Sequence, residues 1–502
     1  MLYYFVQKKI SLFAILILPL VGYAQSGKKD VKLDKRPNIV WIIADEISNN
    51  FDFSYQGNKI VNTPNIDILA NEGVVFSNAY AVNPICSPSR SGVITGMYPT
   101  TIDAQNHRSS RGIFKIYLSK EIKPIPEFFR AAGYYVCNVN ESFTSQGKTD
   151  YNFVFNVDSL YDRPNWENKK PGQPFFAQVQ LEGGKYQYEP YWWNKLEKEL
   201  PHLVTGKQVN SLIPPYYPND SFFRNSWANY LNAVQYTDLQ VGHIIKKLKE
   251  DGVLDNTIIF FSTDHGEAFA RSKQFLYDEG TKIPFIVWAP NRLRHLVRKD
   301  LISNIDMAAT SMYFAGISIP KYIQSRPLFG PDFTPRKFVV CARDRADETV
   351  DKIRSLRMGD FKYIRNYFPK RPYLQPNVYK YKNVPSVAYI VKLSLEDKLD
   401  KAQSLITAKV RPIEELYNLK KDPFEIHNLA NNPKYSQKLK KLRSALVNWR
   451  LTTDDQGMYG ESEKSYNSSM KAYLNEVKEE EDYYNELKKN IDTMKLWRAE
   501  GK

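Results

Sequence analysis

The sequence predicts an α/β fold in which buried strands alternate with helices. Residues 38–44 (NIVWIIA) and 257–262 (TIIFFS) are almost unbroken apolar runs, which are typical of strands covered on both faces. Each run ends in polar residues, Asp45-Glu46 after the first and Thr263-Asp264-His265 after the second. Because doubly wound sheets bind ligands beyond the carboxyl ends of their strands, these residues are the first candidates for a functional site.

Helices are expected between these strands. Thr63-Pro64-Asn65 opens a helical stretch over residues 66–72, which ends before Gly73. Residues 226–250 carry apolar side chains at helical spacing and predict a long amphipathic helix. This order of strands and helices predicts a sheet covered by helices.

Residues 151–223 differ from the rest because they are rich in Tyr, Trp and Pro. We expect an ordered loop region here, inserted near the site. The flat faces of Trp192 and Trp193 suit the stacking of a sugar ring, although aromatic residues in loops more often pack against their neighbours.

The chain changes character after Gly330. Residues 338–342 and 355–367 predict strands, and the second run forms a hairpin around Gly359-Asp360. Residues 433–502 are charged and helical in pattern, with no strong core face expected.

Composition sets the broad class. The 502 residues are 42% hydrophobic, enough for one large core and a smaller unit. A formal net charge of +15 favours polyanionic partners. The chain has no nucleic-acid recognition motif or basic cluster, so we expect no nucleic-acid partner. A generally basic enzyme would need no polyanionic partner at all. The oligomeric state stays open.

The N-terminus predicts export. Lys8 and Lys9 precede a mostly apolar run at 10–21, and Gly22-Tyr23-Ala24 offers a small-residue cleavage site. We expect a signal peptide at 1–24, cleaved after Ala24, and a periplasmic or secreted protein. The run is short for a membrane span, so an uncleaved anchor is the alternative.

Three cysteines do not make a disulfide framework. If Cys86 is modified, Cys137 and Cys341 could pair, but Cys137 lies in the apolar stretch 134–139. A buried free thiol is therefore expected there.

Residues 86–96 (CSPSRSGVITG) place a nucleophile at the start of a predicted helix. Pro88 fits the first turn, and the hydroxyls of Ser87 and Ser89 suit free amides at a helix N-terminus. Arg90 lies one turn beyond Cys86, and the helix dipole attracts anions to the same end. The block indicates a nucleophile that faces an anionic substrate.

The same block resembles the signature of the type I (formylglycine-dependent) sulfatases, C-x-P-S-R-x-x-x-x-T-G. The matching residues are Cys86, Pro88, Ser89, Arg90, Thr95 and Gly96. The resemblance implies that Cys86 becomes formylglycine through a formylglycine-generating or anaerobic sulfatase-maturing enzyme. It also implies an alkaline-phosphatase-like sandwich, with a large mixed central sheet flanked by helices and a smaller C-terminal antiparallel sheet. The catalytic domain would span 25–330, and the C-terminal subdomain 331–502.

The resemblance further implies a calcium site. Its ligands would be Asp45, Glu46, the modified Cys86, Asp264 and His265. Carboxylate oxygens suit a hard cation. The family usually has Asp where Glu46 stands, so this longer side chain either reaches the ion or withdraws from it.

Two lysines are implied to bind sulfate. Lys148 lies in Gly147-Lys148-Thr149-Asp150, which matches the family's Gly-Lys-x-His except that Asp150 replaces the histidine. A nucleotide-binding P-loop is excluded because Ser142 stands where that motif needs glycine. Lys273 would bind sulfate and protonate or stabilise the leaving oxygen.

The catalytic set implied by the resemblance is Cys86, Arg90, Lys148, Lys273, His265 and Asp150. One hydroxyl of the aldehyde hydrate would attack sulfur, and the second would release sulfate with His265 or Asp150 as base. His107 and Arg108 follow the signature helix and are expected to bind substrate, and His107 is also a candidate to share the acid role.

The function implied is an exported sulfatase that acts on a sulfated polysaccharide or oligosaccharide, such as the algal polymer ulvan. Residues 96–109 also resemble the heparan N-sulfatase-like branch, so N-sulfoglucosamine sulfohydrolase activity is an alternative. A phosphate or phosphonate monoester hydrolase of the same superfamily is another. A non-enzymatic polyanion-binding protein is the third, against which the intact Cys86, Arg90 and Asp264 argue.

Overall fold

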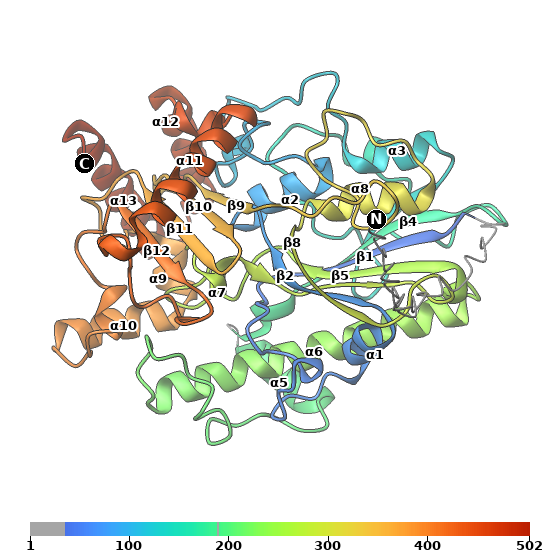
Figure 1. Cartoon of the computed structure of the whole chain (residues 1–502), viewed down its shortest axis with the longest axis horizontal. Coiled ribbons are helices and arrows are strands. Elements are labelled where there is room, and N and C mark those ends of the chain that lie inside the picture. Colours follow the sequence, from blue (N-terminus) through green and yellow to red (C-terminus); the bar gives the residue numbers. More distant parts are fainter. Residues whose placement is uncertain (1–35, 188–189) are drawn as a thin grey trace, which may run out of the picture. The chain divides into compact units, whose positions relative to one another are not determined.

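The computed structural model describes residues 36–187 and 190–502, and its centre is an eight-stranded mixed sheet (Figure 1). The strand order is β3-β4-β1-β5-β7-β2-β6, and β8 pairs with β2. Strands β3, β4, β1 and β5 are mutually parallel, whereas β7 is antiparallel to both β5 and β2. The strands are β1 (Asn38–Ala44), β2 (Val74–Tyr80), β3 (Tyr135–Asn140), β4 (Phe175–Leu181), β5 (Thr257–Thr263), β6 (Lys282–Ile283), β7 (Phe285–Trp288) and β8 (Leu296–Ser303). The mixed central sheet expected from the sequence is confirmed.

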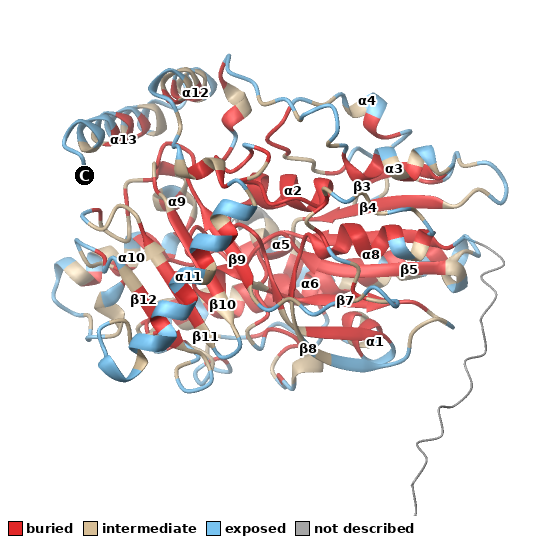
Figure 2. Ribbon diagram, turned by 45° about the horizontal axis from the view of Figure 1, so that its top comes forward, coloured by how far each residue is buried: buried red, intermediate tan, exposed pale blue. Residues whose placement is uncertain are grey.

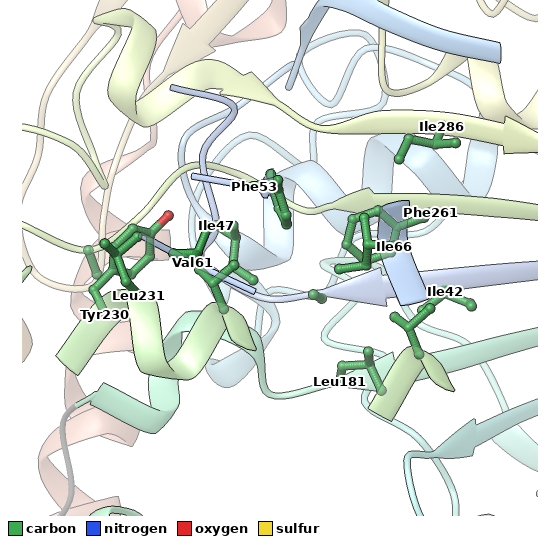
Figure 3. Packing of buried hydrophobic residues seen from close by; sticks show 14 of the residues in the cluster. Ile42, Ile47, Phe53, Val61, Ile66, Leu181, Tyr230, Leu231, Phe261 and Ile286 are labelled. Carbon is green, nitrogen blue, oxygen red and sulfur yellow. The ribbon is translucent and has the colours of Figure 1, made fainter. Parts of the chain in front are cut away.

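Helices cover both faces of this sheet (Figure 1), and Figure 3 shows Ile42, Ile66 and Phe261 within the apolar cluster of one face. Alternate residues of β1 point to opposite faces, so that Trp41 packs with α2, α3 and α8, and Ile42 packs with α1 and α6. Every residue of β1 and of β5 is buried, which explains their unbroken apolar sequence. These helices are α1 (Pro64–Glu72), α2 (Cys86–Thr95), α3 (Ile125–Ala131), α6 (Ser221–Glu250) and α8 (Asp306–Ala315).

The long helix α6 begins five residues before the predicted start. The side chain of Asp220 accepts a hydrogen bond from the Phe223 N–H at 3.0 Å and so caps the helix. The first turn then buries Phe223 in the core.

The expectation of a loop region at 151–223 was wrong in one respect, because this segment contains strand β4. Gln178 and Gln180 interrupt its apolar sequence, and both lie buried in the sheet between β3 and β1. Short helices complete the segment, namely α4 (Val157–Leu160) and α5 (Pro190–Glu199).

A second, four-stranded antiparallel sheet follows in the order β12-β11-β10-β9. Met358 pairs with Phe361, which confirms the predicted hairpin. The strands are β9 (Val339–Arg343), β10 (Ile353–Met358), β11 (Phe361–Asn366) and β12 (Glu414–Asn418). Two helices lie between β11 and β12, α9 (Val378–Asn383) and α10 (Pro385–Leu395).

The tail does have core faces, contrary to expectation. Helix α11 (Ser436–Thr452) packs against β10 and β11, and its buried residues are Leu439, Leu442, Leu446 and Trp449. Helices α12 (Glu463–Glu476) and α13 (Glu481–Ala499) bury one side and expose the other (Figure 2). Many charged residues on the exposed sides mask this pattern in the sequence.

Residues 36–502 form one compact unit that contains both sheets. Cys86, Cys137 and Cys341 are free and buried, and burial raises the pKa of Cys137 and Cys341 above the usual thiol value. Among the described residues, no helix is long and apolar enough to cross a membrane. The expected signal peptide at 1–24 lies outside the described residues.

Candidate active site

Three neighbouring strands deliver the polar groups of the site. Strands β4, β1 and β5 are adjacent and parallel, so their carboxyl ends meet at one edge of the sheet. Asp45 and Glu46 follow β1, Asp264 and His265 follow β5, and Lys185 lies just beyond β4. The topology thus brings together residues more than 200 positions apart in the sequence.

Two glycines let the chain beyond β4 approach this edge closely. A side chain on Gly183 would meet the Asp45 carbonyl oxygen at 2.1 Å, and one on Gly184 would meet that of Glu46 at the same distance. Gly184 N–H instead donates to Asp45 O at 2.8 Å. Lys185 is thereby held against the Asp45 carboxylate, with which it forms an ion pair.

Cys86 is the first residue of α2, as predicted, and it is buried. Its Sγ lies 3.1 Å from His265 Nε2, while His265 Nδ1 lies 2.8 Å from the Gly266 carbonyl oxygen. Burial alone would raise the pKa of the Cys86 thiol, but Lys148 and Lys273 outweigh it and hold the pKa below the usual value. The two lysines therefore favour negative charge at position 86.

The sequence predicts that the hydroxyls of Ser87 and Ser89 cap α2, but no side chain caps this helix. Ser89 Oγ donates to the Asp264 carbonyl oxygen at 2.6 Å, and Ser87 Oγ accepts from the Arg108 N–H at 3.1 Å. They fasten the helix to the end of β5 and to the loop after the helix.

Arg90 connects the strand ends. Its Nε donates to Asp264 Oδ2 at 3.0 Å and one terminal nitrogen donates to Gln180 Oε1 at 2.7 Å, while the other pairs with Asp45. Because only 4% of Arg90 is exposed, these bonds satisfy a guanidinium that has almost no water.

The donors fit a hard cation. One ligand atom each from Asp45, Cys86 and Asp264 lies within 4.8 Å of the others, and the same holds for Glu46, Cys86 and His265. Both aspartates are buried carboxylates, the ligand type that calcium prefers. The structure brings together all five predicted ligands.

Asp45 is also surrounded by cations. Lys148 Nζ donates to its Oδ2 at 2.7 Å, and Arg90 and Lys185 pair with the same carboxylate. Burial would raise the pKa of Asp45, but these three cations outweigh it and hold the pKa well below the usual range. Lys148 thus lies in the site where the sequence placed it.

Glu46 forms an ion pair with Lys273. The Lys273 Nζ also donates to Tyr379 Oη at 3.0 Å and lies 4.7 Å from the centre of the Tyr379 ring. Burial raises the pKa of Glu46, but Lys273 and Lys185 lower it more, to about 2 overall. Glu46 is therefore ionised and fits either of the two roles expected for it.

Asp150 lies beside two cations of the site. It lies 3.7 Å from Lys148 Nζ and 3.6 Å from Arg108 Nε, whereas His265 is the group in contact with Cys86. Burial would raise the pKa of Asp150, but Lys148, His107 and Arg108 lower it below the usual value.

His107 and Arg108 lie beside this group. His107 Nδ1 lies 2.9 Å from Asp347 Oδ1, and Arg108 is half-exposed. The two tryptophans differ from each other: Trp192 packs against Tyr186 with ring centres 4.5 Å apart, whereas Trp193 is 41% exposed.

Four functional neighbours were missed in the sequence, namely Gln180, Lys185, Asp347 and Tyr379. Lys185 had a usable signal, since it follows a strand end through a glycine pair. Asp347 and Tyr379 come from the C-terminal part of the chain, and no local pattern marks them.

Comparisons with known proteins identify the family of this chain. Residues 37–317 match the Sulfatase family model. An "Ulvan-active sulfatase" of Formosa agariphila is 34% identical over 478 residues, which cover 86% of this chain and 78% of that protein.

Two solved structures have the same fold. One is described as a complex with its substrate D-glucosamine-2-N,6-O-disulfate; it is 20% identical, covers 84% of this chain and 99% of its own, and has a TM-score of 0.56. The other is a phosphonate monoester hydrolase of Agrobacterium radiobacter, which is 17% identical, covers 83% and 96%, and has a TM-score of 0.56. With its signature helix, its carboxylate cluster and a family match over more than half its length, the chain belongs to the sulfatase family and is a sulfuric ester hydrolase.

Proposed function

We propose that this sulfatase removes sulfate from a sulfated polysaccharide or oligosaccharide such as ulvan, through a formylglycine at position 86 and a calcium ion. The main support for this substrate class is the similarity to an ulvan-active sulfatase, which is 34% identical over a region that covers 86% of this chain. The many cations around position 86 support it, because a sulfate ester brings a negative charge into a buried site.

The residues divide into two groups by what they hold. Asp45 and Asp264, with Glu46 and His265 beside them, would hold calcium, which would supply positive charge to the sulfate oxygens. Lys148 and Lys273 would bind sulfate oxygens, because each is close enough to Cys86 to lower its pKa, and they pair with two different carboxylates of the site, Asp45 and Glu46.

Oxidation of Cys86 by a sulfatase-maturing enzyme would give an aldehyde, whose hydrate supplies one hydroxyl to attack sulfur and another to release sulfate. His265 Nε2 lies 3.1 Å from Cys86 Sγ, the atom whose place an oxygen takes when Cβ is oxidised to the aldehyde, so His265 would accept the proton of the second hydroxyl. Lys273 is the proton donor to the leaving sugar oxygen. Export to the periplasm or medium would bring the enzyme to its polymer.

One assay separates this function from the alternatives. Purified, matured enzyme is given 4-nitrophenyl sulfate and 4-nitrophenyl phosphate, then ulvan oligosaccharides and N-sulfoglucosamine. We expect sulfate release from the aryl sulfate and the ulvan oligosaccharides, measured by ion chromatography. Faster cleavage of the phosphate would favour the monoester hydrolase, and release from N-sulfoglucosamine alone would favour the sulfamidase.

A further inference from the structure

We infer that Asp347 fixes His107 as a hydrogen-bond acceptor for a hydroxyl of the sugar that carries the sulfate. Asp347 is then a positioning residue for substrate recognition, contributed by the turn between β9 and β10. The inference rests on the proposed function, because it needs a saccharide in the site.

The two nitrogens of His107 have different surroundings. Nδ1 lies 2.9 Å from Asp347 Oδ1, and a carboxylate only accepts hydrogen bonds, so Nδ1 carries a proton. Nε2 has no hydrogen-bond partner among the described residues, and 10% of the side chain is exposed. Burial lowers the pKa of His107 below its usual value in spite of Asp347, which favours the neutral ring. Its Nε2 then presents a lone pair.

His107 lies beside the part of the site that would bind sulfate. The next residue, Arg108, donates its N–H to Ser87 Oγ at 3.1 Å, directly beside Cys86. His107 is also close enough to Asp150 for each charge to shift the pKa of the other. Asp150 in turn lies 3.7 Å from Lys148 Nζ, a sulfate-binding group.

Asp347 is itself held in place. It has a left-handed φ of 50° in the turn where Ala346 and Thr349 exchange backbone hydrogen bonds of 2.9 Å. Arg111 lies 3.5 Å from its Oδ1 and is held by helix α12, where it stacks over the Tyr473 ring at 3.8 Å. The backbone N–H of His107 donates to the Arg345 carbonyl oxygen at 2.9 Å, which holds the backbone of His107 in place.

A fixed lone pair selects what can approach it. Sulfate oxygens are acceptors only and are repelled by Nε2, whereas a sugar hydroxyl can donate to it. A site built to pair with a hydroxyl discriminates strongly against a substrate that lacks one, because its polar group is left unpaired. An aryl sulfate has no such hydroxyl, so it does not use His107.

The first test reads the proton directly and needs no turnover. Nitrogen NMR of the protein labelled at its histidines reports which ring nitrogen carries the proton, and H107Q identifies the His107 signals. We expect the Nδ1–H form in the wild type and a mixed or reversed population in D347N, because Asn can also donate to Nδ1. A wild-type ring protonated on Nε2 overturns the inference.

The second test compares two substrates. In D347N, kcat/KM on an ulvan oligosaccharide should fall at least about tenfold more than on 4-nitrophenyl sulfate, with most of the change in KM. H107Q should keep more saccharide activity than H107A, because the glutamine oxygen reaches the place of Nε2. E348Q is the matched control: Glu348 is the next residue in the same turn, and it contacts Val378 and Asn490 instead.

Equal losses on both substrates in D347N would mean a structural role and would overturn the inference. If the wild type cleaves neither substrate, the proposed function fails, and with it the recognition of a sugar hydroxyl. The control of the His107 proton by Asp347 would still be decided by NMR, so the two failures are distinguishable.

Discussion

Arg90 Nε lies 3.0 Å from Oδ2 of Asp264, which stands 174 residues later in the chain. This bond fastens helix α2, which begins at Cys86, to the end of strand β5. The same guanidinium pairs with Asp45 at the end of β1 and with Gln180 in β4. One side chain therefore sets the spacing between the two carboxylates best suited to calcium. This role depends on the planar fork of arginine as well as on its charge.

Arg90→Lys keeps the charge but cannot reach three partners at once. We expect kcat on an aryl sulfate to fall about 100-fold or more, since the carboxylates lose their fixed separation. Calcium affinity measured by calorimetry should fall in parallel. Lys438→Arg, on the surface of α11, is the control for exchanging one cationic side chain for another. Calcium binding by Arg90→Lys equal to that of the wild type would contradict the role of Arg90 in setting the distance between the two carboxylates.

Cys86→Ser tests the nucleophile. Serine is not oxidised by the cysteine-specific maturation route and has no second hydroxyl, so turnover should be abolished while the fold stays intact. Mass spectrometry of the wild-type peptide that contains residue 86 should show the aldehyde. Cys137→Ser, at a buried free thiol in β3, is the matched control and should keep its turnover. Near-normal rates from folded Cys86→Ser would eliminate the covalent mechanism.

Asp264→Asn tests the metal site. It keeps the size of the side chain but removes one of the few carboxylates from a hard-ion site, so calcium binding and activity should both be lost. Calorimetry of the purified variant checks the binding. Asp238→Asn makes the same change at a buried carboxylate that accepts from Ile66 and Asn65, away from the site. Calcium binding by Asp264→Asn equal to that of the wild type would show that the ligand assignment is wrong.

The sequence predicted β1 and β5 well because both faces of these strands are covered, which leaves an apolar run with a polar end. It did not reveal β4, because two buried glutamines break the apolar pattern: Gln180 accepts a hydrogen bond from Arg90, and Gln178 donates to the hydroxyl of Tyr161. Lys185 was missed with the strand, since its role depends on the neighbour that β4 has in the sheet.

The contribution of the C-terminal part had no sequence signal at all. Tyr379 reaches Lys273 and Asp347 reaches His107 across separations of 106 and 240 residues. Such contacts depend on how the second sheet packs, which no local spacing encodes. The signature helix could be predicted because its nucleophile and its arginine lie within one helical turn, so that the local sequence alone brings them together.

The two tryptophans of α5 now carry different expectations. Trp193→Ala should raise KM on ulvan oligosaccharides and leave aryl sulfate cleavage almost unaltered, because this ring is exposed. Trp192→Ala should instead lower the melting temperature, since its ring packs on Tyr186. Kinetics on both substrates and thermal melts of both variants check this pair. Equal kinetic losses on the two substrates in Trp193→Ala would rule out a sugar platform.

A buried ion pair beside the second sheet should make stability depend on pH. Asp351 Oδ1 and Oδ2 each lie 2.9 Å from a terminal nitrogen of Arg411, and both side chains are fully buried. Burial raises the pKa of Asp351, but Arg411 and Arg343 outweigh it and lower the pKa from 3.8 to about 2. The folded-state pKa lies below the unfolded one, so the ionised pair stabilises the fold above about pH 4 and loses this contribution as pH falls toward 2.

The size of this effect follows from the shift, which corresponds to about 2 kcal/mol of stability at neutral pH. About half of it, ~1 kcal/mol, should be gone at pH 3. Asp351→Asn removes the titrating group, so the variant should be less stable than the wild type at pH 6. The difference between their free energies of unfolding, measured in urea, should become smaller by ~1 kcal/mol between pH 6 and pH 3. Asp397→Asn, at an exposed position, should run parallel to the wild type over the same range. A constant deficit for Asp351→Asn would mean that the Asp351 carboxylate does not titrate with folding.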